Sequence, residues 1–153
     1  MMSEKFCLKW NDFHSNIGKS FKSLRYDDDL FDVTLVRDDH SQVSAHKLVL
    51  SACSEYFKNI FKNNKHSHPL LCLEGVSSND LNNVLDYIYN GETQIFQDNL
   101  DRFLDVAQRF KLEGLIADQT LKDEERYVEE GNQTKVDGRV LNLKNSFLLI
   151  LVT

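Results

Sequence analysis

Apolar and polar residues alternate in several short stretches of the chain, and this two-residue period is typical of half-buried strands. The clearest example is residues 31–35, where Phe31, Val33 and Leu35 alternate with polar residues. The same period places Phe6, Leu8 and Trp10 on one face of a short strand near the amino terminus. The pattern predicts short strands at residues 5–10, 31–35, 43–45, 70–73 and 93–96.

A period of three to four residues indicates helices between and after these strands. Four polar residues stand where helices are expected to begin, because their side chains can accept hydrogen bonds from free backbone N–H groups. These predicted caps are Asn11, Ser54, Ser77 and Asp98, and a further helix is predicted at residues 46–53. Early paired strands followed by helices predict an α+β fold.

The charge is spread unevenly over the 153 residues, whose formal net charge is −6. Residues 1–117 and 118–130 each carry a net charge of −4, whereas residues 131–153 carry +2. The first block also holds 14 of the 16 aromatic residues, so the core is expected there. We predict a domain at 5–117, an acidic extension at 118–131 that suits a helix, and a tail at 132–153 that is poorly ordered or adds one strand.

Composition excludes several classes of protein. The longest apolar run, residues 147–152, is too short for a membrane-spanning helix, which needs about 20 residues. The first residues contain no apolar stretch of signal-peptide length, and three cysteines are too few for a disulfide framework. A reducing compartment inside the cell is therefore expected. The acidic balance also disfavours direct contact with nucleic acid.

No sequence motif for catalysis or cofactor binding is present. The six glycines form neither of the Gly-rich loops that hold phosphates, and no Gly-x-Ser-x-Gly motif marks a serine nucleophile. Cys53 and Cys72 lie in apolar segments and Cys7 stands between two apolar residues, so all three thiols are expected to be packed and unreactive. The sequence predicts a protein that is not an enzyme and needs no cofactor.

Histidine side chains are candidates for metal ligands or catalytic bases. His66 and His68 lack the third and fourth ligand of a stable zinc site, so a solvated loop is favoured over a metal site. His46 heads a predicted helix, and we expect it to be partly buried and hydrogen-bonded rather than a catalytic base.

Asp32 is the most informative acid, because it lies inside a predicted strand that has at least one apolar face. A carboxylate buried there needs a partner, and Lys47, just after the following strand, is a candidate. The alternative is an open, solvated strand face. The residue pattern alone does not choose between them.

A set of ordered segments carries a family signature: residues 31–35, 45–54, 56–57, 87–92 and 110–115. Together they resemble the BTB/POZ domain, over about residues 5–117. The opening residues 6–11, FCLKWN, resemble the amino-terminal signature of the Tramtrack-type subgroup of insect transcription regulators.

The resemblance implies a small β-sheet flanked by a cluster of helices, in a dimer that exchanges its amino-terminal strand. Residue periodicity alone would instead keep the first helix's apolar stripe inside the monomer core. The resemblance also implies a charged pair, Asp32 and Lys47, in a groove at the dimer that contacts co-regulators. The implied dimer-interface residues are Phe6, Leu8, Trp10, Phe13, Ile17 and Phe21.

The resemblance implies an interaction module that takes part in transcription regulation and chromatin complexes in the nucleus. Expected partners are itself, as a homodimer or higher multimer, other BTB-domain proteins and transcriptional co-regulators, with no direct nucleic-acid or membrane contact. No zinc-finger pattern follows the domain. The alternative function is a cullin-type ubiquitin ligase adaptor, which is disfavoured because residues 60–65 lack the expected Glu.

Overall fold

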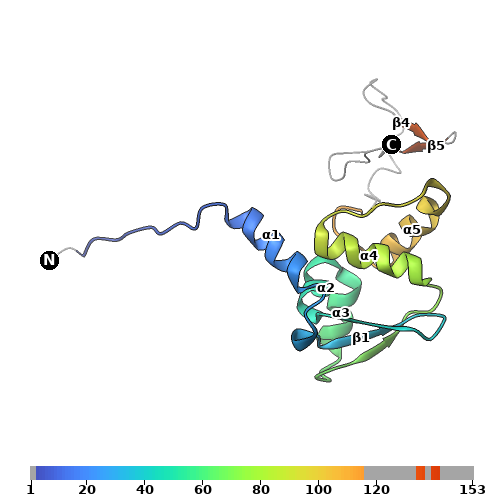
Figure 1. Cartoon of the computed structure of the whole chain (residues 1–153), viewed down its shortest axis with the longest axis horizontal. Coiled ribbons are helices and arrows are strands. Elements are labelled where there is room, and N and C mark those ends of the chain that lie inside the picture. Colours follow the sequence, from blue (N-terminus) through green and yellow to red (C-terminus); the bar gives the residue numbers. More distant parts are fainter. Residues whose placement is uncertain (1–2, 116–133, 137–138, 142–153) are drawn as a thin grey trace.

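The computed structural model describes residues 3–115, 134–136 and 139–141 of the chain (Figure 1). The predicted acidic extension and most of the predicted tail lie outside the described residues. The described tail residues form two short strands, β4 (Thr134–Val136) and β5 (Arg139–Leu141), which pair antiparallel with each other.

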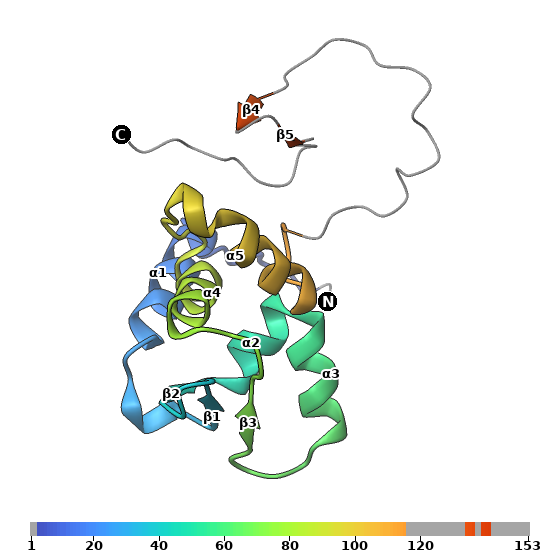
Figure 2. The same ribbon diagram turned by 90° about the vertical axis from the view of Figure 1, so that its right-hand side faces the viewer.

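A mixed three-stranded sheet, in the order β2-β1-β3, forms one end of the domain (Figure 2). The central strand β1 (Val33–Val36) pairs antiparallel with β2 (Gln42–Ala45) and parallel with β3 (Leu70–Cys72). Alternate residues of β1, Val33 and Leu35, are fully buried, as the two-residue period predicts. The three strand predictions in this part of the chain are confirmed to within two residues.

Four helices pack around and above the sheet (Figure 2). They are α2 (Lys47–Cys53), α3 (Glu55–Asn63), α4 (Ser78–Asn90) and α5 (Gln97–Arg109). A short 3₁₀ turn, η1 (Asp28–Leu30), precedes β1. The largest side chains of the fully buried core are Phe57, Phe110, Leu35, Leu50, Leu81 and Leu85. The α+β fold is therefore confirmed.

Two predicted helix caps are confirmed by their hydrogen bonds. The Ser54 hydroxyl accepts the Phe57 N–H at 3.2 Å and donates to the Phe110 carbonyl, which ties α3 to the end of α5. The Ser77 hydroxyl accepts the Asp80 N–H at 3.1 Å and donates to the Asp80 carboxylate at 2.7 Å. Each cap satisfies N–H groups that have no partner within the helix.

Three predictions about local structure are wrong. Residues 93–96 form no strand, because no neighbouring strand in the described part of the chain pairs with them. Asp98 lies in the first turn of α5 and does not cap it; the helix begins at Gln97, with no side-chain hydrogen bond from the capping position, Phe96. Asn11 is not the cap of the first helix either, since that position is taken by Asp12.

The first helix, α1 (Phe13–Leu24), contacts α4 and points away from the body of the domain (Figure 1). Residues 3–12, which we call the arm, continue outward from it as an extended chain. No helix in the described ranges is both long and apolar enough to cross a membrane.

Candidate functional site

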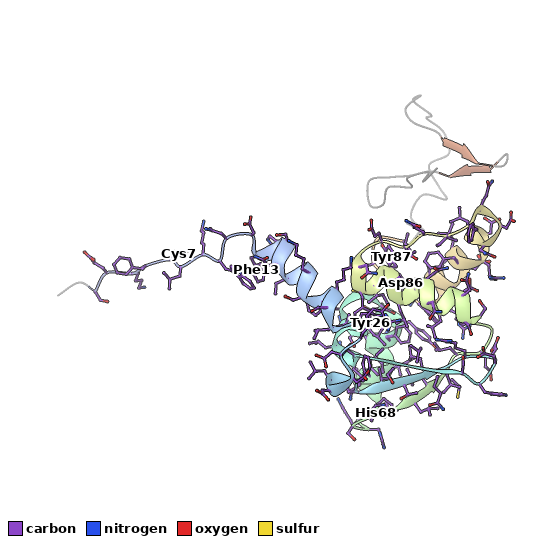
Figure 3. The ribbon with its side chains drawn as sticks, viewed as in Figure 1. Cys7, Phe13, Tyr26, His68, Asp86 and Tyr87 are labelled. Carbon is purple, nitrogen blue, oxygen red and sulfur yellow. The ribbon has the colours of Figure 1, made fainter. Side chains whose placement is uncertain are left out.

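The arm exposes three large apolar side chains on backbone that has no strand partner. Phe6 is 82% exposed, Leu8 94% and Trp10 59%. In the described residues the arm forms no strand, so the predicted strand at 5–10 is not formed within a single copy. Figure 3 shows Cys7 on the arm and Phe13 at the start of α1, both away from the body of the domain. Apolar side chains beside unpaired backbone are the features of a strand that lacks its partner.

The junction between the arm and α1 has an unusual backbone conformation. Asp12 has φ +58°, in the left-handed region that residues other than glycine rarely adopt. Its carbonyl accepts the Asn16 N–H at 2.9 Å and the Ser15 hydroxyl at 3.1 Å. The Trp10 and Phe13 rings meet edge to face, 5.3 Å apart, just across this turn. The junction therefore directs the arm outward and not back along α1.

Helix α1 has no fully buried residue. Ile17, Phe21 and Leu24 are half-buried, and Phe21 packs against the domain's own core. Phe13, one turn earlier on the same stripe, is 45% exposed. The helix therefore uses its carboxyl-terminal half for the core of its own copy and leaves its amino-terminal half uncovered.

Asp32 and Lys47 are brought together, but not as a side-chain ion pair. The Asp32 carboxylate accepts the backbone N–H of Lys47 at 2.7 Å. The Lys47 ammonium instead donates to the carbonyls of His66 and Ser67, at 3.3 and 3.2 Å. Within one copy the two charged side chains therefore do not bind each other directly, and their place in a groove at the dimer stays a prediction. Asp32 caps α2 from outside, since the His46 side chain makes no capping bond.

Behind Asp32 lies a buried polar cluster of His46, Tyr89 and Arg25. The Tyr89 hydroxyl accepts the backbone N–H of His46 at 3.0 Å and lies 2.6 Å from His46 Nδ1. The hydroxyl donates to Nδ1 in the tautomer that leaves this nitrogen unprotonated, and burial favours the neutral imidazole. The prediction of a buried, hydrogen-bonded His46 is confirmed.

Burial controls the protonation of this cluster. It lowers the pKa of His46 and outweighs the opposing effect of the Asp32 and Asp27 carboxylates, while the Arg25 guanidinium lowers that pKa further. Burial also raises the pKa of Tyr89 to about 12. Arg25 is 8% exposed and lies 5.4 Å from the centre of the Tyr89 ring. Sequence reasoning missed Arg25 and Tyr89, because nothing in their spacing links them to His46.

Residues 93–96 form a second uncovered segment, between α4 and α5. Their N–H groups make no backbone hydrogen bond to any described residue. Ile95 is half-buried against the core, whereas Phe96 is 84% exposed. The apolar pattern that predicted a strand here falls on a segment that pairs with no strand among the described residues.

The remaining candidates are not gathered into a site. His66 and His68 are exposed, and His68 Nε2 lies 2.9 Å from the Thr34 hydroxyl. Cys7 and Cys72 are exposed, so the prediction that they are packed is wrong. Cys53 is half-buried; burial and the Glu113 carboxylate raise the pKa of its thiol, as expected of an unreactive cysteine.

Comparison with known proteins gives consistent matches. A family model described as the BTB/POZ domain matches residues 21–123. The chain is 44% identical over 112 residues to protein abrupt of Drosophila melanogaster, covering 73% of this chain and 12% of abrupt. It is also 44% identical over 117 residues to the Drosophila melanogaster longitudinals lacking protein-like, covering 75% of this chain and 91% of that protein. Tramtrack, alpha isoform, from the same organism is 40% identical over 116 residues, with coverage of 75% and 14%.

The fold comparison agrees. The structure of the BTB (Tramtrack and Bric a brac) domain of human gigaxonin superposes with a TM-score of 0.61 at 22% identity, covering 72% of this chain and 91% of that one. At this identity the likeness concerns the fold alone. The chain spans only a small part of abrupt and of tramtrack, and nearly all of the longitudinals lacking protein-like.

Proposed function

This chain belongs to the BTB/POZ domain family, a family of protein-interaction modules, and on that premise we propose that it works by assembling with a second copy through its arm and α1. The observation that carries the proposal is the arm itself. Phe6, Leu8 and Trp10 are each more than half exposed, on backbone without a strand partner. Leaving these side chains and unpaired backbone groups in water costs free energy. The strand edge of a partner would cover the apolar surface and supply hydrogen bonds to the backbone.

The segment at 93–96 supplies a matching edge. It is extended, its N–H groups are unpaired among the described residues, and Phe96 adds exposed apolar surface. An arm that adds to this segment of a second copy forms the exchanged strand of the dimer. The amino-terminal half of α1, with the exposed Phe13 and the half-buried Ile17, then lies where the two copies meet. Two arms exchanged in this way make the dimer symmetric and its interface closed.

The regulatory part of the proposal rests on the relatives. The matches to abrupt, tramtrack and the bric-a-brac proteins support a role in transcription regulation and a nuclear location. The net charge of −6 disfavours direct binding to DNA, so we assign that role to partner subunits and co-regulators. Other BTB-domain chains and higher multimers are included among the proposed partners.

The test is the mass of the whole chain in solution, measured by light scattering and native mass spectrometry. We expect a dimer or a larger assembly at micromolar concentration. A charge at Phe13, in the variant Phe13→Asp, is expected to yield monomers, because a carboxylate buried between two copies has no counter-charge there. Leu70→Asp makes the same kind of change at another exposed apolar residue, in β3, and is expected to leave the mass unchanged.

Circular dichroism of each variant shows whether the domain is still folded. A folded wild-type chain that remains monomeric at micromolar concentration would refute the proposed assembly. Equal masses for Phe13→Asp and the wild type would show that the two copies meet elsewhere.

A further inference from the structure

The charge of the domain is separated between the projecting part and the body. Residues 3–24, the arm and α1, hold four Lys and two Asp or Glu, a net of +2. Residues 25–115 hold nine Lys or Arg and fifteen Asp or Glu, a net of −6. Because the arm and α1 extend away from the body (Figure 1), the two signs are also separated in space.

The arm presents its two lysines on the face opposite its large apolar residues, while Glu4 and Asp12 fall on the apolar side. In an extended chain, alternate residues point to opposite sides, so Lys5 and Lys9 share one side, while Phe6 and Leu8 share the other. Both lysines are exposed, and neither has an ion-pair partner among the described residues. About 13 Å separates them along a strand.

Acids flank the uncovered segment at 93–96. Glu92 precedes it and Asp98 follows it, and both side chains are exposed. An arm that pairs with this segment brings its two lysines to an edge bounded by carboxylates. Apolar contact and opposite charge thus favour the same placement of the arm.

We propose that assembly is directed by this charge separation, with Lys5 and Lys9 of one copy beside Glu92 and Asp98 of the second copy. The inference rests on the proposed function, and it adds what selects the partner: a chain whose arm has one basic face and whose edge is acidic. Opposite charges across an interface accelerate encounter and exclude partners of like charge more than they add to affinity. The symmetric exchange repeats the contact, so two sets of charges act in each dimer.

A charge-swap experiment on the full chain tests this directly. The double variant Lys5→Glu/Lys9→Glu reverses the arm, and Glu92→Lys/Asp98→Lys reverses the edge. Each variant alone places like charges together at both contacts, and we expect its dimer dissociation constant to rise roughly tenfold or more. A mixture of the two variants restores opposite charges at both contacts, and native mass spectrometry should show mixed dimers dominating over either homodimer.

The control is Lys62→Glu/Lys65→Glu, which changes the net charge equally at exposed lysines outside the arm. Its dissociation constant is expected to stay within about twofold of the wild type. Raising the salt concentration should weaken the wild-type dimer, where it screens an attraction, but should not weaken the dimer of the arm variant, where it screens a repulsion.

The outcome separates the two proposals. If Phe13→Asp gives monomers while both charge variants dimerise as the wild type does and mix at random, assembly stands and charge direction is refuted. If the wild type is itself monomeric, the proposed assembly is refuted, and the charge direction that rests on it is refuted with it.

Discussion

At the scale of single residues, burial decides the protonation of His46, and the hydroxyl of Tyr89 is its hydrogen-bond partner. This hydroxyl accepts the His46 backbone N–H and faces Nδ1, leaving Nε2 buried without a partner among the described residues. A second proton on this imidazole would sit on Nδ1, against a hydroxyl that has to turn its own hydrogen away. It would also place a positive charge near Arg25. The fold therefore favours the neutral imidazole of His46.

This predicts a stability that depends on pH. Because burial lowers the pKa of His46 below its ordinary value of 6.5, the unfolded chain binds the proton more readily than the folded chain. The contribution of the neutral His46 to the free energy of unfolding is complete above about pH 6.5 and is lost as the pH falls below it. We expect Tm to be lower at pH 5.5 than at pH 7.5, and His46→Gln to reduce that difference, as measured by thermal unfolding at constant protein concentration.

A second group titrates well outside that range. Hydrogen bonds from Ser41 and Ser78 lower the pKa of Asp39 to about 2, so the contribution of Asp39 to stability is lost only as the pH falls from about 4 to about 2.

An equal drop in Tm for His46→Gln and the wild type between pH 7.5 and 5.5 would contradict the assignment to His46.

At the scale of elements, the capping of α2 by Asp32 predicts independent effects for the two charged residues. Asp32→Ala is expected to lower the free energy of unfolding by about 0.5–2 kcal/mol through the lost cap. Lys47→Ala keeps the backbone N–H that Asp32 binds and removes only the bonds to the 66–67 carbonyls. The two losses should add to within about 0.5 kcal/mol in urea unfolding of the single and double variants.

A side-chain ion pair would give a different result. Each single substitution would then remove the same interaction, and the double variant would be more stable than the sum of the two losses implies. A coupling energy above about 1 kcal/mol would therefore favour the direct pair.

Helices with a side-chain cap and a clear apolar stripe could be predicted from the sequence, as α3 and α4 show. Their beginnings are fixed locally, by Ser54 and Ser77. The absence of strands at residues 5–10 and 93–96 could not be predicted from the sequence, because a strand depends on a neighbour that its own sequence does not specify. The partner of Asp32 was missed for a related reason: a nearby backbone N–H competed with the Lys47 ammonium, and residue type says nothing about backbone donors.

At the scale of the whole molecule, the proposed assembly through the arm predicts that stability depends on protein concentration. A folded dimer and an unfolded monomer exchange by mass action, so more protein favours the folded state. A hundredfold increase in concentration adds about 2.7 kcal/mol per dimer, which raises Tm by roughly 3–5 °C for a molecule of this size. Thermal unfolding over that range measures the effect.

Phe13→Asp provides the comparison. If this variant is a folded monomer, its Tm should not change with concentration, because unfolding then involves one chain on each side. A wild-type Tm that is equally constant would mean that the folded chain gains nothing from a second copy.

The exposed arm also distinguishes a free subunit from an assembled one. Until it is taken up, every copy displays Phe6, Leu8 and Trp10 on extended backbone, the form in which chaperones and proteases engage a chain. In the proposed assembly, uptake by a partner hides the same residues. Copies left without a partner would then be more open to proteolysis than assembled ones, which would match the number of subunits to the number of partners.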